Sequence, residues 1–318
     1  MSLAIEIPRD TGDLTPAGVL GLPIAVATSA GLASGEEGLH ILICQPEIAA
    51  TAHLLLPRGA NAMISLPSLP LVAAGAVVSG EGLVVSGADA GGGALIIGLS
   101  RDGEMVWRSP LGGPPPVRWP VPFAMPEPVV VWQVLANQIE IAGINGGVLQ
   151  AESAVRTGGP PLALAGAGGM LWAVWAEGGS VAGLMHDRAG TSLFRVADGA
   201  ADAIAVGALD RLGWVAWTAA GATFLAEPGS TPGEIELSRA AGGALAIIPG
   251  RFPVVWAQQT ALDDYGDRIY VSALARRGRP PILFEGLVHA VAWWGEWLAV
   301  LGATDLWLLA STGDGFEE

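Results

Sequence analysis

Short apolar segments and glycine-containing links alternate along nearly the whole chain. Residues 162–167 (LALAGA), 170–177 (MLWAVWAE) and 180–187 (SVAGLMHD) are three consecutive examples, separated only by Gly-Gly pairs. No segment keeps the 3.6-residue periodicity of an amphipathic helix over several turns, and short apolar runs between turn signals are typical of buried strands. Glycine supplies the positive φ that tight hairpin turns require. The pattern therefore predicts an all-β protein built from hairpins.

A tryptophan recurs at a regular interval within this pattern. Trp132, Trp175, Trp217 and Trp256 each follow a pair of small or β-branched residues, at intervals of 43, 42 and 39 residues. A period of this size is typical of a four-stranded propeller blade and is too short for a βαβ unit with its connections. We therefore expect a seven-bladed β-propeller, with residues 1–318 forming one domain.

The strands can be assigned blade by blade from the tryptophan repeat. The fourth to sixth blades are predicted at residues 162–167, 170–177, 180–187 and 191–197; 203–209, 212–219, 223–227 and 233–239; and 243–249, 252–259, 267–275 and 281–287. The second and third include strands at residues 83–88 and 128–136, with a Pro-rich link at 112–122, and residues 48–79 are irregular. The seventh offers only residues 288–295, 296–303 and 305–311. Residues 4–9 (AIEIPR) are predicted to supply its missing outer strand, so that no sheet edge is left free at the closure.

Two segments resemble known propeller repeats. Residues 94–107 (ALIIGLSRDGEMVW) resemble the quinoprotein-type repeat, in which a strand, an Asp-Gly turn and a Trp-bearing strand follow one another. Residues 254–256 and 267–271 are similar to the repeat of TolB-type propellers. The chain thus resembles the bacterial β-propeller superfamily. Each likeness covers less than one blade, so it implies the fold and no cofactor. The Trp-Asp and Gly-His pairs of WD repeats are absent.

Composition restricts the possible partners and the compartment. Hydrophobic residues make up 51% of the chain and mean hydropathy is +0.50, yet no apolar run approaches the roughly 20 residues of a membrane-spanning helix. The net charge of −15, with fifteen arginines and no lysine, argues against binding to nucleic acid. Cys44 stands alone in an apolar segment and is interpreted as an inert core thiol. With no leader visible, a cytoplasmic location is expected.

His289 is the candidate catalytic residue. It opens the innermost predicted strand of the seventh blade, where a histidine facing the channel could act as a general base. A purely structural histidine is the alternative, because no carboxylate partner is evident in the sequence. The other three histidines, His40, His53 and His186, form no zinc-binding spacing with one another or with Cys44.

Asp263, Asp264 and Asp267 surround a glycine turn between two predicted strands of the sixth blade. Carboxylate oxygens in such a turn are ligands that Ca²⁺ accepts, although the spacing is not that of an EF-hand loop. A solvated turn is the alternative. Residues 35–38 (GEEG) form a similar acidic cluster in the first blade. Projection of both clusters from one face would make a negative patch there.

The twelve tryptophans divide into packing residues and candidate contacts. The four that recur at one blade position are expected to pack between neighbouring blades. Trp293 and Trp294 must point to opposite faces of their strand, so one of them could be exposed. Trp119, beside Arg118 in the Pro-rich link, could anchor a partner, because tryptophan and arginine are favoured at interface hot spots. Packing of Trp119 onto its own sheet is the alternative.

No set of residues in the sequence converges on a catalytic signature, and fold alone does not decide the function of a propeller. Low charge and high apolar content favour a non-catalytic interaction module, either a scaffold or a subunit of a larger protein assembly. A lyase or hydrolase with its site at the channel mouth, using His289, is the first alternative. A carbohydrate-binding propeller, suggested by the number of tryptophans, is the second.

Overall fold

The computed structural model is almost entirely β-structure and divides into two compact units. Unit 1 contains residues 1–21 and 157–318, and unit 2 contains residues 22–156. The structure describes residues 4–6, 14–80, 82–111, 118–124, 128–135, 137–145, 147–158, 162–235, 244–250, 253–262, 265–266, 268–277 and 280–311. Within these ranges the only helical element is a single 3-10 turn, η1 (Pro46–Ile48).

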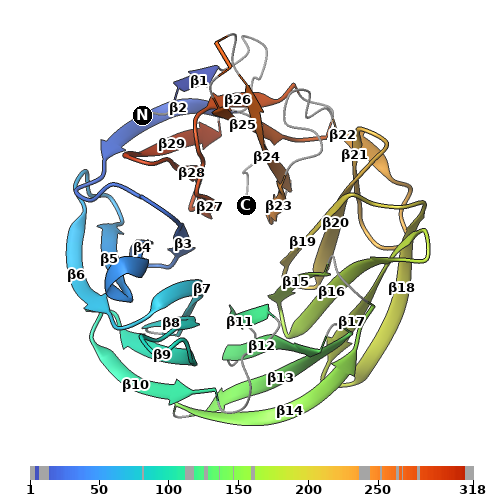
Figure 1. The fold of residues 1–318 in the computed structure, drawn as a ribbon, viewed down its shortest axis with the longest axis horizontal. Helices are drawn as coiled ribbons and strands as arrows, with labels where there is room; N and C mark the ends of the chain where they lie inside the picture. Colours follow the sequence, from blue (N-terminus) through green and yellow to red (C-terminus); the bar gives the residue numbers. More distant parts are fainter. Residues whose placement is uncertain are drawn as a thin grey trace. The chain divides into compact units, whose positions relative to one another are not determined.

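Unit 2 contains three antiparallel sheets, each made of four consecutive strands (Figure 1). The first is β3 (Ala30–Ser34), β4 (Gly38–Gln45), β5 (Ala50–Pro57) and β6 (Ile64–Leu69). The second is β7 (Val72–Ser79), β8 (Gly82–Ala88), β9 (Ala94–Ser100) and β10 (Met105–Pro110). The third is β11 (Arg118–Ala124), β12 (Pro128–Leu135), β13 (Gln138–Asn145) and β14 (Val148–Arg156).

Unit 1 contains four antiparallel sheets, two of which are also simple meanders. These two are β15 (Leu162–Ala167), β16 (Met170–Glu177), β17 (Ser180–Asp187) and β18 (Gly190–Asp198), and β19 (Ala203–Leu209), β20 (Leu212–Ala219), β21 (Ala222–Ala226) and β22 (Gly233–Ile235). The strands β23 (Ala244–Ile248), β24 (Val254–Leu262), β25 (Arg268–Ala275) and β26 (Ile282–Glu285) form the third, joined at its edge by β1 (Ala4–Glu6). The fourth is β27 (Ala290–Trp294), β28 (Trp297–Leu301) and β29 (Asp305–Ser311), completed by β2 (Leu14–Gly21).

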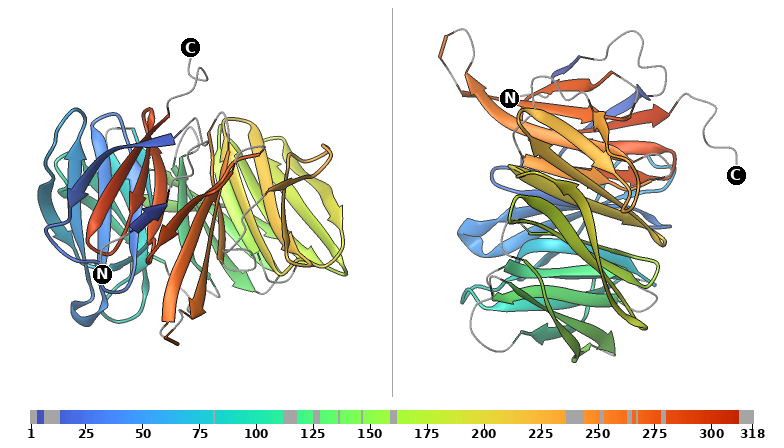
Figure 2. Two further views of the ribbon diagram at one scale, coloured as in Figure 1. Left: turned by 90° about the horizontal axis from the view of Figure 1, so that it is seen from above. Right: turned by 90° about the vertical axis from the view of Figure 1, so that its right-hand side faces the viewer.

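Successive sheets within each unit meet through their first strands. In unit 2, β7 contacts both β3 and β11; in unit 1, β19 contacts β15 and β23, and β23 contacts β27. The strong twist of the sheets in unit 1 is visible in Figure 2, as expected for short antiparallel sheets. Several hairpins use glycine where the backbone demands it: Gly168 and Gly169, which join β15 to β16, have φ of 58° and 79°. Two consecutive positive φ values are typical of the primed turns that suit twisted strands.

An N-terminal strand completes the last sheet, as expected, but the residues predicted for it were wrong. Strand β2 pairs with β29 from Leu14↔Ser311 to Gly21↔Asp305. Ala4–Glu6 pairs instead with β26, as a fifth strand on the preceding sheet. Pro16 and Gly18 argue against a strand in the sequence. An edge strand tolerates proline and glycine, however, because one of its sides makes no ladder hydrogen bonds. The register shift between these two residues absorbs the irregularity.

The Pro-rich link was also predicted too long. Its second half is strand β11, which pairs with β12 from Arg118↔Gln133 to Ala124↔Pro128. Arg118 and Trp119 are therefore strand residues rather than part of a linking loop. β11 is the edge strand of its sheet, where proline is tolerated, and its pairing shifts register between Arg118 and Val121.

The recurring tryptophans pack inside, as the sequence predicts. Trp132, Trp175 and Trp217 are buried, and Trp256 packs against a buried cluster that contains Val254. Cys44 is buried as well, and its thiol donates a hydrogen bond to the carbonyl of Ala73, with an S···O distance of 3.2 Å. In the described part of the chain, no helix is long and apolar enough to cross a membrane.

Candidate functional site

His289 lies just before β27 and makes no contact that a general base needs. Its backbone N–H donates to the carbonyl of Leu301 at 2.8 Å, which extends the β27–β28 ladder. Its Nε2 is buried and has no hydrogen-bond partner among the described residues. Burial lowers the pKa of His289, because it disfavours the charged imidazolium. The carboxylate that would orient this ring in an active site is not found in the described part of the molecule.

The predicted Ca²⁺ ligands and the predicted tryptophan anchor involve residues that the structure does not describe in full. Asp263, Asp264 and Asp267 lie outside the described residues, as do the side chains of Arg118 and Trp119. Within the described ranges, no three histidine, cysteine or acidic side chains gather as metal ligands. The Ca²⁺ site and the tryptophan anchor remain predictions.

Trp293 and Trp294 point to opposite faces of β27, as strand alternation requires. Trp293 is partly buried and packs against the cluster that contains Leu298 and Leu309. Trp294 is 4% exposed and lies 5.1 Å from Trp297 between ring centroids. Trp294 is therefore buried and Trp293 only partly so, and their role in an interface stays a prediction.

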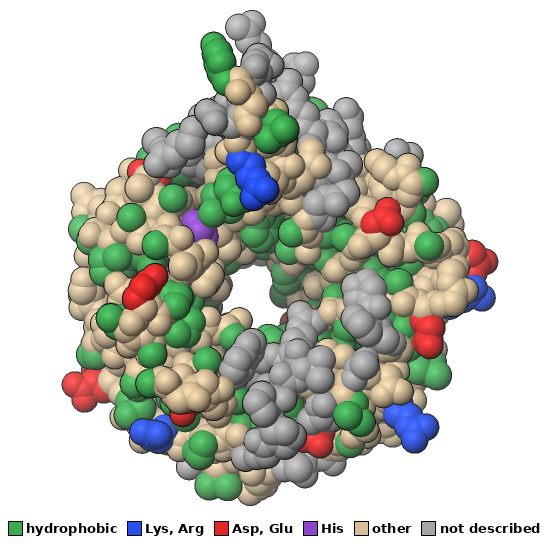
Figure 3. Space-filling view, in the orientation of Figure 1, with side chains coloured by type: hydrophobic (Ala, Val, Ile, Leu, Met, Phe, Trp, Pro, Cys, Tyr) green, Lys and Arg blue, Asp and Glu red, His purple; other side chains and the backbone are tan. Residues whose placement is uncertain are grey.

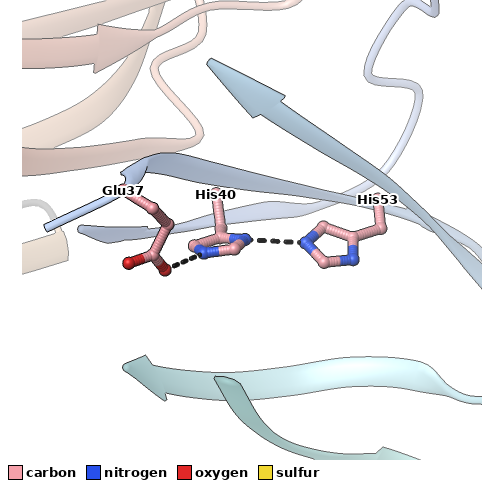
Figure 4. A network of polar contacts seen from close by, with 3 residues as sticks. All are labelled: Glu37, His40 and His53. Atoms are coloured by element: carbon pink, nitrogen blue, oxygen red, sulfur yellow. Dashed lines mark hydrogen bonds and ion pairs between the residues drawn. The ribbon is translucent and has the colours of Figure 1, made fainter. Parts of the chain in front are cut away.

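The structure brings together three polar residues of unit 2 that the sequence did not link (Figure 4). The Nδ1 of His40 lies 2.9 Å from the Nε2 of His53, and the Nε2 of His40 lies 2.9 Å from the Oε1 of Glu37. His40 and His53 are each 1% exposed, and Glu37 is partly exposed. A carboxylate and two imidazoles in a row have the composition of a proton relay. Their burial and their pKa values decide whether they transfer protons or serve packing.

Strand register places the two histidines on one face of the sheet. His40 is opposite Leu55 and His53 is opposite Leu42, so the histidines are diagonal neighbours across the β4–β5 pair. Glu37 belongs to the β3–β4 turn, three residues before His40. The turn formed by η1 sets this register by pairing Gln45 with Ala50.

The contacts determine which nitrogens carry protons. The ionised carboxylate of Glu37 can only accept, so the Nε2 of His40 donates to it. The Nδ1 of a neutral His40 then accepts from the Nε2–H of His53. This leaves the Nδ1 of His53 as a bare acceptor, and it has no hydrogen-bond partner in the described structure. A second proton on His53 would create a buried N–H without an acceptor.

The pKa values agree with this proton arrangement. Burial, followed by the charge that His40 can carry, lowers the pKa of His53 to about 4. Partial burial alone would raise the pKa of Glu37, but the hydrogen bond from His40 and the nearby charges of His40 and Arg101 give a net lowering. Near neutral pH the network therefore holds an ionised Glu37 and a neutral His53.

The network is enclosed between two sheets of unit 2. Gly103, in the β9–β10 turn of the next sheet, lies against the ring of His53: a methyl group added there would meet the Nδ1 at 3.4 Å and Leu66 at 3.0 Å. On the same strand face, the hydroxyl of Thr51 donates to the carbonyl of Leu71 at 2.7 Å and accepts from the N–H of Ala73 at 3.0 Å. Together these contacts tie β5 to the segment that begins the next sheet.

The surface carries apolar side chains on several outer strands. Large apolar residues are exposed on β2 (Val19), β6 (Ile64), β10 (Met105 and Val106), β14 (Val148) and β18 (Leu193). Leu193 is 75% exposed and Val106 is 67% exposed. Edge strands are usually protected by charged residues. Figure 3 shows scattered charged side chains of both signs, with apolar side chains between them, among the described residues on one face.

Comparison with solved structures identifies the fold. The chain resembles the Pan2 WD40 domain of Neurospora crassa, with 12% identity, a TM-score of 0.56, and coverage of 96% of this chain and 98% of that one. It also resembles a chain of the mitotic checkpoint complex, with 12% identity, a TM-score of 0.59, and coverage of 98% and 99%. The chain has the β-propeller fold. At this level of identity the likeness concerns the fold alone.

A third propeller of comparable similarity is a lectin. The Aleuria aurantia lectin, solved with a fucoside, shares 12% identity and gives a TM-score of 0.51, with coverage of 82% of this chain and 96% of the lectin. No protein-family model matches the chain, and no curated protein matches its sequence. The bacterial, quinoprotein-type and TolB-type likenesses therefore stay predictions, while the propeller fold itself is confirmed.

Proposed function

We propose that this propeller is a non-catalytic interaction module that binds a protein partner through its outer strands. The observation that carries the proposal is the exposure of large apolar side chains on β2, β6, β10, β14 and β18. Single exposed apolar residues are common on protein surfaces. Here six of the thirteen exposed large apolar side chains among the described residues lie on these five outer strands, in a chain with only 14% charged residues.

The enclosure of the polar network supports the same proposal. His40 and His53 are each 1% exposed, and the contacts of Glu37, His40 and His53 are made to one another. A general base must reach a proton of a bound substrate within hydrogen-bond distance. Two histidines buried between two sheets serve packing better than turnover. The chain of the mitotic checkpoint complex and the BBS1 domain solved with ARL6 are propeller structures determined in protein complexes, which is compatible with such a role.

We also propose that residues 1–318 form one domain and that the seven sheets formed by the described residues are its seven blades. The support is the succession along the chain of seven antiparallel sheets, six of four strands and one of five, together with the N-terminal strand β2, which completes the sheet of β27–β29. One cooperative transition in calorimetry, with a calorimetric enthalpy equal to the van't Hoff enthalpy, is expected. Two separate transitions would contradict a single domain.

The interaction proposal is tested by affinity isolation of the tagged full chain from its native cells. A variant with Val106→Lys, Val148→Lys and Leu193→Lys is expected to lose at least tenfold of any partner that the wild type retains. The matched control, Ser29→Lys, Ser34→Lys and Asn137→Lys, adds the same charge at exposed positions outside the outer strands and should retain the partner. A wild-type chain that retains no protein above a tag-only sample, and sediments as a monomer, would contradict the proposal.

A further inference from the structure

An apolar cleft of about 630 Å³ opens between the sheets β15–β18 and β19–β22 of unit 1. Its floor contains Trp217 and Phe224, whose rings stack with centroids 5.5 Å apart and planes 23° from parallel. Trp217 is almost fully buried, whereas Phe224 is only partly buried. The volume lies within the range of about 300–1,000 Å³ that is typical of ligand pockets. The cleft continues outward from the apolar cluster that packs these two sheets together.

One wall of the cleft is the end of an outer strand. Residues 195–198, at the end of β18, line it, and β18 pairs only with β17 among the described strands. The nine residues of β18 are therefore a free sheet edge to which another strand could add. A segment paired there would place an alternate side chain above Phe224.

The opposite wall contains the β20–β21 turn. Ala220, in the β20–β21 turn, lines the cleft with a φ of 51°. Glycine takes the corresponding first turn position at Gly168 and Gly178. A non-glycine residue in this conformation is uncommon, and Asp210 takes it at the corresponding position of the β19–β20 turn, with a φ of 52°. The side chain of Ala220 adds a methyl group to the cleft wall, where a glycine would present only backbone atoms.

Charge at this end of the two sheets is mainly negative. Asp198 lines the cleft and forms an ion pair with Arg195. The turn after Glu177 lies beside it, because the N–H of Gly199 donates to the carbonyl of Gly179 at 2.6 Å. Asp202 lies at the same end, where its N–H donates to the carbonyl of Thr218 at 2.8 Å. Glu177, Asp198 and Asp202 are all exposed at this end, and Asp198 forms the ion pair with Arg195.

We propose that this cleft is the site at which the module binds an extended segment of its partner, which places a large apolar side chain in the cleft and an adjacent arginine or lysine beside the carboxylates. The proposal rests on the interaction role proposed above. Main-chain pairing with β18 supplies affinity, and the cleft and its charge select the sequence. A net charge of −15 on the whole chain favours the same basic partner.

The test is selection of twelve-residue peptides from a random display library on the purified full chain. Selected peptides are expected to share a large apolar residue with arginine or lysine within two positions of it. For one synthesised peptide, Asp198→Arg should weaken binding at least tenfold. Glu296→Arg, at an exposed turn of the same unit, makes the same charge change away from the cleft and should weaken binding less than twofold. Thermal unfolding followed by circular dichroism verifies that both variants fold.

Three results would overturn the site: no enrichment over a blank surface, an acidic consensus, or equal loss of binding in the two variants. The interaction role is judged separately, by affinity isolation of the wild-type chain. If isolation finds a protein partner and the selection fails, the cleft is wrong and the interaction role stands. If isolation finds none, the interaction role itself fails.

Discussion

Two seams between neighbouring sheets, one in each unit, are built from opposite chemistry. The apolar seam, between β15–β18 and β19–β22 in unit 1, is filled by Trp172, Val174, Val215 and smaller apolar residues. The polar seam, between β3–β6 and β7–β10 in unit 2, combines an apolar cluster around Leu42 with Glu37, His40, Thr51 and His53.

The two seams show that residue types found in catalytic sites can also serve packing between sheets. The Glu37–His40–His53 network has the residue types of a catalytic relay, yet it occupies the same architectural place as the tryptophans of the apolar seam. Both seams are buried, so both contribute to packing. The difference between them is that the polar seam contains groups that titrate, and its stability should respond to pH.

The largest expected effect is in the apolar seam. Trp172→Ala removes a buried indole that lies against Gly213, where an added methyl group would meet the ring at 2.7 Å. The free energy of unfolding in urea should fall by about 3–5 kcal/mol, the usual cost of truncating a buried tryptophan. Leu193→Ala, at an exposed position, should change it by less than about 0.5 kcal/mol. Equal effects of the two substitutions would contradict the packing described.

The polar seam should weaken in acid. The folded pKa of His53, about 4, lies below its ordinary value of 6.5, so between these values the unfolded chain binds the extra proton. Stability is therefore complete above about pH 6.5 and falls by about 3 kcal/mol as the pH drops toward 4. Urea unfolding of the wild type and of His53→Leu at several pH values measures this. A variant that keeps the full fall over this range would exclude His53 as its cause.

Thr51 allows a comparison between two buried hydroxyls. Thr51→Val leaves the carbonyl of Leu71 and the N–H of Ala73 without the partner they have now, and the free energy of unfolding should fall by about 2 kcal/mol. Thr218 is equally buried, but its hydroxyl has no partner among the described residues. Thr218→Val should be neutral or stabilising. Urea unfolding that shows the reverse order would contradict these hydrogen-bond assignments.

The smallest expected effect is at Glu37. Glu37→Gln keeps an oxygen that accepts from His40 but removes the charge, so the free energy of unfolding at pH 7 should fall by about 1 kcal/mol. Because the folded pKa of Glu37 lies below 4.5, its contribution is present above that pH and is lost as the pH falls through the folded pKa. Glu36→Gln, at the neighbouring exposed position, is the control for urea unfolding. A loss of the same size in this control would show that Glu37 has no special role.

Period and hairpin chemistry were sufficient to predict much of the fold. Strands β15, β16, β17, β19, β20 and β29 have the predicted bounds, because strong apolar patterns and glycine turns mark both ends of most of them. The closing strand was misplaced because Pro16 and Gly18 disguise an edge strand, and Ala4–Glu6 has a better local pattern. Local strand propensity does not tell whether a segment is the fourth strand of the last sheet, as β2 is, or a fifth strand on the preceding sheet, as Ala4–Glu6 is.

The polar network was missed for a different reason. His40 and His53 were considered only for zinc-binding spacing, and no strand register between them was derived. A four-residue connection that pairs Gln45 with Ala50 puts both histidines on one face, so this contact was within reach of the sequence. Glu37 was seen only as part of an acidic turn. The packing of Gly103 over His53 joins two sheets and needs the tertiary structure.

His40 and His53 are buried and contribute to packing between two sheets, whereas the proposed interaction surface lies on the outer strands. The most direct measurement is an NMR titration of the imidazole nitrogens of His53 in the full chain. The account predicts a pKa of about 4 and, near neutral pH, a proton on Nε2 with none on Nδ1. Titration near or above the ordinary histidine value, or a proton on Nδ1, would indicate a ring open to solvent and available for proton transfer, and would contradict it.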